Sequence, residues 1–320
     1  MTKTILITGG SGVLGKELLK ELIEDYKMIA IGKNYVNFPD SIRFHKNFKF
    51  YERDLSQINH PEEFLIPESI DLILHLAAVV SGEKVTEEVY HQINVNSTKL
   101  LVEFAKTNNI PHFGFVSSVS VYGSKEIHLN LNSERMGKTI YAKTKALAED
   151  YVINAERPYS IFRMASIYGK GTKSFISKLK SLSKKRVYPY ISSTREKSVL
   201  HIADAINALV TWTKQTLAGK PPKPIYVFSH PEFVTVNQVI RTFQELGIAK
   251  KNLFPVPVGG FWAKIVELIF QFLALVRRKP FHGSPLQPLL ESVAIYDSKS
   301  WENLGIFPER DLRKGLTDYQ

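Results

Sequence analysis

The stretch TILITGGSGVLGKELL, residues 4–19, joins an apolar run, a glycine-rich turn and an amphipathic, helix-like segment. Within the turn, Gly9, Gly12 and Gly15 have the spacing G-x-x-G-x-x-G. Glycine permits a tight turn, lets the backbone approach a pyrophosphate and lets a helix pack closely on a strand. Free N–H groups at the start of the helix would face that diphosphate. The stretch therefore predicts a dinucleotide-binding unit. Its predicted cofactor contacts are Gly9, Gly12, Val13, Leu14 and Gly15.

Outside this unit, short apolar runs continue to alternate with helix-like segments. The expected strands are 4–8, 27–32, 48–55, 71–77, 112–118 and 159–169. The expected helices are 13–25, 89–108 and 141–156. Such alternation predicts an α/β fold with a doubly wound parallel sheet, the Rossmann arrangement. We expect a dinucleotide-binding domain over residues 1–167 and a smaller substrate-binding domain over 168–320, with about 198–229 returning to the first core.

Composition narrows the function classes. The chain has 320 residues and no cysteine, which excludes disulfides, thiolate catalysis and cysteine-ligated metal, and no metal site is predicted. No signal-peptide pattern precedes the first strand, so a cytoplasmic location is expected. The net charge of +11 favours an acidic partner, such as a phosphorylated metabolite or an anionic membrane surface. Nucleic acid is not expected, because no aromatic-interleaved basic motif accompanies the charge.

The end of the second expected strand bears on cofactor choice. In this fold an acid usually stands there and hydrogen-bonds the adenosine ribose 2′-OH. Here the sequence IAIGKN has Gly32, Lys33 and Asn34 instead. A lysine with no carboxylate beside it would attract a 2′-phosphate, which favours NADP(H) and leaves NAD(H) as the alternative. Lys33 could equally be an ordinary surface lysine. Asp54, after the third strand, suits either the adenine end or a helix N-cap.

The segment IYAKTKALAE, residues 140–149, places Tyr141 one helical turn before Lys145. Hydride transfer to or from a carbon bearing oxygen requires a proton to join or leave that oxygen. Free tyrosine titrates near pH 10, so it needs help to act as a base near neutrality. A lysine one turn further on would favour the phenolate. The pair alone leaves open whether these are catalytic groups or an ordinary polar helix face.

Together, these motifs resemble the extended short-chain dehydrogenase/reductase family, in its nucleotide-sugar-modifying epimerase/dehydratase branch. The matching segments follow the family's order over nearly the whole chain. They are TGGSGVLG (8–15), DL (54–55), HLAA (75–78), NVNSTKLL (94–101), VSSVSVYG (116–123), YAKTKALAE (141–149), FRMASIYG (162–169), VLHIADA (199–205) and YDSKSWENLGIFP (296–308). No single segment is specific, but the ordered set is.

The resemblance implies roles for individual residues. Tyr141 would be the catalytic acid–base and Lys145 would support it while holding the nicotinamide ribose. Ser118 would hydrogen-bond the same substrate oxygen, and Asn94 would steady the lysine. Further cofactor contacts are implied for Lys33, Asp54, Leu55, Leu76, Ala77 and Ala78. Implied substrate contacts are Ser118, Ser166 (where relatives often have asparagine), and Lys197 or Arg195 for the diphosphate. A homodimer through helices 89–108 and 141–156 is also implied.

Within the family, the resemblance implies an NAD(P)-dependent oxidoreductase that acts on a nucleotide-diphosphate sugar in polysaccharide biosynthesis. Dehydration is disfavoured, because Val119 and Ser120 stand where dehydratases carry an Asp-Glu pair. A 4-keto sugar reductase is preferred, and a 4-epimerase is the alternative. A hydroxysteroid-type alcohol dehydrogenase and a non-catalytic cofactor-binding scaffold are weaker alternatives, the scaffold because Tyr141 and Lys145 are both retained.

The segment FWAKIVELIFQFLALVRRKP, residues 261–280, has a different character from the rest of the chain. Its apolar run is too short and too often interrupted by polar residues to span a bilayer, which requires about 20 apolar residues. A broad apolar face ending in basic residues suits a helix lying in a membrane surface, so 261–279 predicts a peripheral membrane contact. A buried helix or a subunit contact is the alternative.

Overall fold

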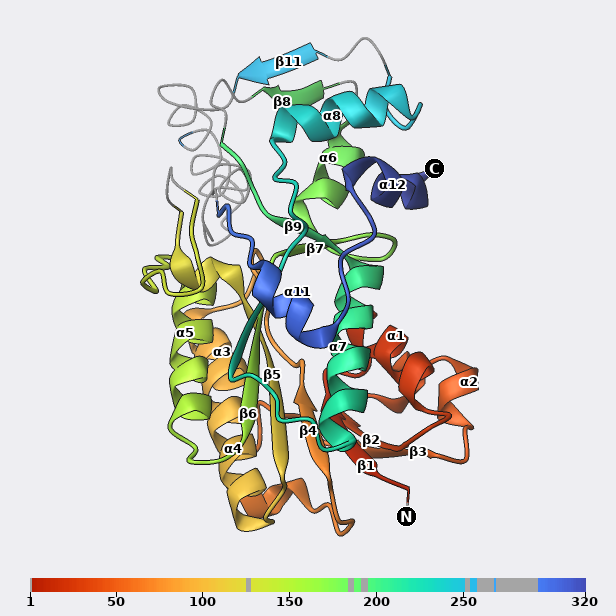
Figure 1. Cartoon of the computed structure of the whole chain (residues 1–320), viewed down its shortest axis with the longest axis vertical. Coiled ribbons are helices and arrows are strands. Elements are labelled where there is room, and N and C mark those ends of the chain that lie inside the picture. The colour runs from red at the N-terminus through yellow and green to blue at the C-terminus, as the bar shows by residue number, and fades with distance from the viewer. Residues whose placement is uncertain are drawn as a thin grey trace.

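A parallel sheet of seven strands carries the fold (Figure 1). The computed structural model describes residues 2–124, 128–183, 187–190, 195–250, 254–257, 268 and 293–320. The sheet contains β1 (Thr4–Thr8), β2 (Lys27–Gly32), β3 (Phe48–Glu52), β4 (Leu72–His75), β5 (His112–Ser118), β6 (Tyr159–Met164) and β10 (Ile225–Phe228). Their order is β10-β6-β5-β4-β1-β2-β3. The predicted α/β fold with a doubly wound parallel sheet is therefore confirmed.

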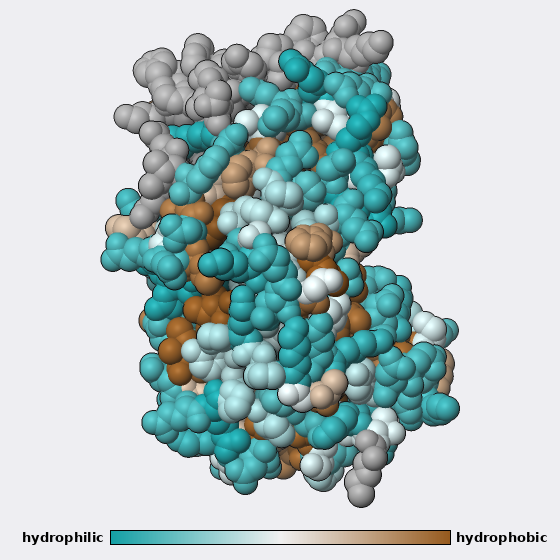
Figure 2. Space-filling view, in the orientation of Figure 1, coloured by the Kyte–Doolittle hydropathy of each residue, from teal (hydrophilic) through white to brown (hydrophobic). Residues whose placement is uncertain are grey.

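Both faces of the sheet are covered, as a parallel sheet requires. On β1, Ile5 and Ile7 point into one core while Leu6 points into the other. The first core is closed by α1 (Val13–Leu22), α7 (Ile202–Leu217) and α11 (Ser298–Leu304), and the second by α4 (Ser97–Thr107) and α5 (Ile140–Ile153). Figure 2 shows mainly polar residues over the face that carries α7 and α11, with apolar residues visible between the elements.

The predicted helix 89–108 is one continuous helical stretch made of three segments, two α-helical and one π-helical. It begins with α3 (Glu87–Tyr90), passes through a π-helical segment η3 (His91–Asn96) and continues as α4. Helix α5 packs beside it (Figure 1). The shorter helical segments are η1 (Tyr35–Asn37), α2 (Asp40–Arg43), η2 (Pro61–Phe64), η4 (Val119–Tyr122) and η5 (Thr317–Tyr319).

The predicted strand 159–169 is wrong in its continuity. It divides at Ala165 into β6, which pairs with β5 and β10, and β7 (Ser166–Tyr168), which pairs with β9 (Val199–His201). The chain leaves the main sheet there because the two halves have different partners. Beyond this point lie α6 (Phe175–Ser183), α8 (Val236–Glu245) and α12 (Leu312–Leu316), around a third apolar core, and the parallel pair β8 (Val187–Tyr190) and β11 (Phe254–Pro257).

The predicted membrane-surface helix, 261–279, falls outside the described residues apart from position 268. In the described parts of the chain, no helix has both the length and the apolar character needed to cross a bilayer.

Candidate active site

The glycine-rich turn lies between β1 and α1. Neighbouring backbone packs against it where other residues would have a Cβ atom. Gly9 has a φ of +69°, and a Cβ there would come within 2.7 Å of the Ala77 backbone nitrogen. A Cβ on Gly15 would come within 2.4 Å of the Gly9 carbonyl oxygen, so α1 can approach the turn only with glycine there. At Gly12, by contrast, a Cβ would meet only that same carbonyl, at 3.1 Å. The turn therefore fits a pyrophosphate over Gly12 at the start of α1.

A cleft of about 790 Å³ extends from this turn along the carboxyl ends of the strands. It opens where the strand order reverses between β1 and β4, the usual ligand position in doubly wound sheets. Every predicted cofactor-binding residue lines it. The predicted catalytic and substrate-binding residues that line it are Ser118, Tyr141, Lys145, Ser166 and Lys197.

Helix α5 presents Tyr141 and Lys145, the two residues predicted to be catalytic, to the end of β5. Thr139 caps the helix by accepting a hydrogen bond from the Ala142 N–H at 3.2 Å. Tyr141 then hydrogen-bonds with Ser118, the last residue of β5. The Lys145 ammonium, one turn further on, donates to the Val116 carbonyl at 2.7 Å. The helix thus brings the two predicted catalytic side chains to one edge of the cleft.

Burial controls the ionisation of this pair. Burial raises the pKa of Tyr141 to about 12, although the hydrogen bond with Ser118 acts in the opposite direction. Burial also lowers the pKa of Lys145 to about 7, and the Glu149 carboxylate partly offsets that effect. The pKa of Tyr141 is shifted here by burial, Ser118 and Tyr90, while the Lys145 ammonium is hydrogen-bonded to the Val116 carbonyl. The expectation that Lys145 draws Tyr141 towards the phenolate stays a prediction.

Asn94 supports the catalytic helix indirectly. Its side-chain oxygen accepts from the Val79 N–H at 2.7 Å, and its amide donates to the Val79 carbonyl at 3.1 Å. The amide also donates to the Thr144 hydroxyl at 3.2 Å. Asn94 thus fixes the loop after β4 to α5 through the residue before Lys145, from within the π-helical segment. Such π-turns are frequent at functional sites.

The end of the cleft formed by β2 and β3, where the adenosine of a cofactor is predicted to bind, holds an ion pair that the sequence did not reveal. Lys33 Nζ lies 2.9 Å from Asp54 Oδ2. The premise that no carboxylate stands beside this lysine is therefore wrong. The ends of β2 and β3 pair side by side, with the Arg53 N–H donating to the Gly32 carbonyl at 2.8 Å, and this pairing brings Asp54 to Lys33.

Residues 5–227, more than half of the chain, match the NAD dependent epimerase/dehydratase family. The chain belongs to this family. It is therefore an enzyme of the extended short-chain dehydrogenase/reductase type, as the sequence motifs predicted.

Individual relatives agree with this assignment. Human dTDP-D-glucose 4,6-dehydratase is 28% identical over 241 residues, which cover 68% of this chain and 67% of the relative. UDP-glucose 4-epimerase from Vibrio cholerae is 25% identical over 333 residues, covering 99% of this chain and 94% of the relative. Among solved structures, UDP-glucuronic acid 4-epimerase from Bacillus cereus with NAD and UDP-glucuronic acid has a TM-score of 0.77 and 19% identity, covering 99% and 98% of the two chains.

Two buried polar groups of this family member escaped sequence reasoning. The first is His75 at the end of β4, whose ring nitrogens contact the Thr8 hydroxyl at 2.6 Å and the Thr98 hydroxyl at 2.9 Å. Burial, assisted by the Lys145 charge, lowers the pKa of His75 to about 3, so the ring is neutral. It ties β1, β4 and α4 together beneath the glycine turn. The only sequence signal was its place within HLAA.

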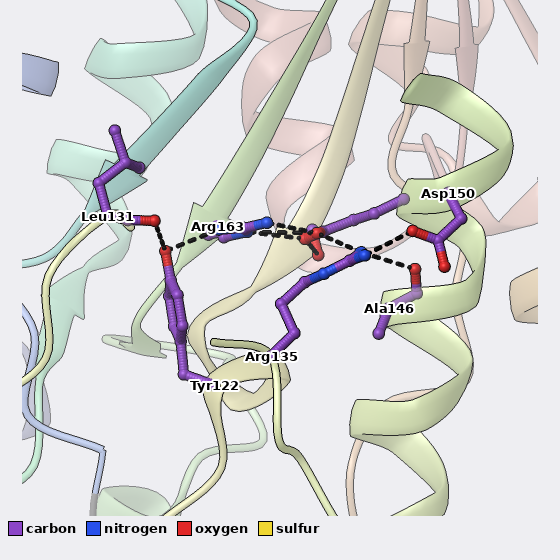
Figure 3. Close-up of polar contacts among 8 residues, drawn as sticks. Tyr122, Leu131, Arg135, Ala146, Asp150 and Arg163 are labelled. Atoms are coloured by element: carbon purple, nitrogen blue, oxygen red, sulfur yellow. Dashed lines mark hydrogen bonds and ion pairs between the residues drawn. The ribbon is translucent and has the colours of Figure 1, made fainter. Parts of the chain in front are cut away.

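The second is an ion network around Glu149, two turns after Tyr141 on α5 (Figure 3). Its carboxylate accepts from the Arg163 guanidinium at 2.7–3.2 Å, from the Ser117 hydroxyl at 2.6 Å and from Arg135 at 3.3 Å. Arg163 also donates to the Tyr122 hydroxyl at 2.7 Å. The network joins α5 to β5 and β6 one helical turn beyond Lys145.

The substrate end of the cleft is cationic. Lys197, 6% exposed, lies with its ammonium 5.6 Å above the Phe175 ring, and Lys173 and Lys178 also line the cleft. Ser166 lines it at the start of β7. Arg195 is exposed and is not part of the lining. Of the two diphosphate candidates, only Lys197 therefore faces the cleft.

Proposed function

We propose that this enzyme reduces the 4-keto group of a nucleotide-diphosphate sugar. The observation that carries the proposal is the pairing of Tyr141 with Ser118 at the cleft edge, with burial holding the pKa of Tyr141 at about 12. A phenol that keeps its proton at neutral pH is suited to donating it, which is what carbonyl reduction requires. The human dehydratase and the Vibrio cholerae epimerase act on nucleotide sugars by name.

The residues divide the work as follows. The glycine turn would hold a nicotinamide dinucleotide, which when bound would provide hydride for the carbonyl carbon. Ser118 orients the carbonyl oxygen by hydrogen bonding, and Tyr141 delivers a proton to that oxygen as it becomes an alkoxide. Lys145, adjacent to Tyr141, favours the negative charge that develops on these oxygens. Lys197, Lys173 and Lys178 provide positive charge for the substrate diphosphate.

The cofactor that we propose is NADP(H), with NAD(H) also accepted. Gly32, at the end of β2, offers no carboxylate to bind the ribose 2′-OH, and Lys33 lines the cleft there. Relatives in solved structures contain NAD, for example the Bacillus cereus epimerase.

A 4-epimerase is the second candidate, favoured by one specific observation. The alignment with the Vibrio cholerae 4-epimerase spans nearly the entire chain, whereas that with the human dehydratase covers 68% of it. An epimerase would use the same residues in both directions, with Tyr141 first taking and then returning the proton.

One assay separates the two. The purified enzyme, given a 4-keto-6-deoxy nucleotide sugar and NADPH, should consume NADPH in proportion to sugar reduced. The variant Tyr141→Phe should lower the rate by about a hundredfold or more, because the proton donor is lost. Interconversion of two 4-hydroxy sugars without net NADPH consumption would instead identify an epimerase. Thermal protection by a steroid rather than a sugar nucleotide would identify a hydroxysteroid dehydrogenase.

The homodimer implied by the sequence stays a proposal. Helix α5 exposes Leu147 and Tyr151 on the surface beside α4, as a face that packs on a second copy would.

A further inference from the structure

The adenosine corner of the cleft is formed by the ends of β2 and β3. Gly32, Lys33, Arg53 and Asp54 line it together. A Cβ on Gly32 would meet only the Phe50 ring, at 3.6 Å, so this corner has free space beside the strand end. The charged side chains that line it are two cations, Lys33 and Arg53, and one anion, Asp54.

The two cations differ in freedom. Arg53 donates to the backbone carbonyls of Glu52 at 2.7 Å and Glu63 at 3.3 Å, which hold its guanidinium in place. Lys33 has a 63% exposed side chain, and its ammonium contacts Asp54 alone among the interactions recorded for it in the described structure. Lys33 is therefore the cation that can move towards a phosphate.

Asp54 is the fixed member of the pair. Its Oδ1 accepts hydrogen bonds from the Ser56 N–H at 2.9 Å and the Ser56 hydroxyl at 2.7 Å, while Oδ2 faces Lys33. Burial alone would raise the pKa of Asp54, but hydrogen bonds from Ser56 and Lys33 outweigh it and lower the pKa. The carboxylate is thus ionised and stationary at neutral pH.

This arrangement has a consequence for cofactor choice. A phosphate on the ribose 2′-oxygen carries close to two negative charges near neutral pH. At this corner it would be attracted by Lys33 and repelled by Asp54, whereas a 2′-hydroxyl carries no charge and is not repelled by a carboxylate. We propose that Asp54 is a specificity-determining residue: by neutralising Lys33 it restrains the preference for NADP(H) and lets the enzyme accept NAD(H). The inference deepens the cofactor part of the proposed function and rests on it.

The test is a double-mutant cycle on binding. Dissociation constants of NADPH and NADH are measured by calorimetry without any sugar, for wild type, Asp54→Asn, Lys33→Ala and the double variant. Asparagine keeps an oxygen for Ser56, so the turn is preserved. We expect Asp54→Asn to shift the ratio of the two constants towards NADPH by about five- to tenfold. Adding Lys33→Ala should reduce that shift to the part that comes from the direct repulsion between Asp54 and the 2′-phosphate.

A matched control exists in the same chain. Asp71 pairs with Lys3 at 2.7 Å with similar exposure, 27% and 50%, at the beginning of β1 and β4, away from the cleft. Asp71→Asn should leave the ratio unchanged.

An unchanged ratio in Asp54→Asn would overturn the proposal. So would a shift of the same size without Lys33, since neutralisation of Lys33 would then contribute nothing. Because no sugar takes part, the outcome is independent of whether the enzyme is a reductase or an epimerase.

Discussion

One carboxylate–cation pair lines the cleft and another lies buried outside it, at nearly equal distances and with opposite character. At the ends of β2 and β3, Lys33 and Asp54 line the cleft 2.9 Å apart, with side chains 63% and 32% exposed. Between α5 and β6, Arg163 and Glu149 are 2.7 Å apart and 5% and 0% exposed. Water can solvate the first pair when it opens but cannot reach the second. The contribution of an ion pair to the free energy of unfolding therefore depends on its burial more than on its contact distance.

Breaking the buried pair should have the largest effect. In Arg163→Met, the Glu149 carboxylate stays buried and loses its main counterion, so we expect the free energy of unfolding to fall by about 3–5 kcal/mol. Urea denaturation followed by circular dichroism measures this change. The control is Arg313→Met, which removes the exposed partner of Glu245 and should cost less than about 1 kcal/mol. Equal losses in the two variants would contradict the comparison.

The buried network around Glu149 should also affect the pH dependence of catalysis. Lys145, with a pKa of about 7, is positive below neutrality and neutral above it, while Tyr141 keeps its proton throughout. The reduction rate should therefore fall by about tenfold between about pH 6 and about pH 8, as Lys145 loses its charge. Because the Glu149 carboxylate raises the pKa of Lys145, Glu149→Gln should move this decline to lower pH. A decline at the same pH in Glu149→Gln would show that Glu149 does not influence the pKa of Lys145.

At the exposed end, adding a carboxylate should act on one cofactor only. Gly32→Asp has room for its side chain, since only Phe50 approaches the position. The new carboxylate should repel a 2′-phosphate and accept the 2′-OH, which weakens NADPH binding by about five- to tenfold and spares NADH. Fluorescence titration with both cofactors measures it. Parallel losses for both would indicate a distorted strand end rather than a charge effect.

Removing the exposed cation should have the smallest effect on the fold. Lys33→Ala deletes a surface ion pair, so the free energy of unfolding should change by less than about 1 kcal/mol in the cofactor-free enzyme. Thermal unfolding of the wild type and the variant provides the measurement. A loss comparable with that of Arg163→Met would show that exposure does not separate the two pairs.

The features that could be predicted from the sequence are those formed by residues close together along the chain. The glycine turn and the Tyr141–Lys145 spacing each lie within a few residues of chain, so their geometry is fixed by one turn or one helix. Contacts between segments far apart were not predictable. Asp54 reaches Lys33 only through the pairing of β2 with β3, and Arg163 reaches Glu149 only because β6 lies beside β5 under α5. The division of the strand at Ala165 could not be predicted, because an apolar run does not indicate which strand it pairs with.

The π-helical segment His91–Asn96 acts as a phase shift along one helix. An α-helix repeats its faces every 3.6 residues, and a turn closed one residue later rotates everything beyond it. Before the segment, Tyr90 turns its hydroxyl to the Val80 carbonyl beside the cleft, and after it, Leu101 and Phe104 turn into the core beneath the sheet. The π-helical segment thus lets one helix direct Tyr90 to the cleft and Leu101 and Phe104 to the core. Deleting one residue from this segment would turn the Asn94 side chain in another direction, although every predicted site residue would still be present.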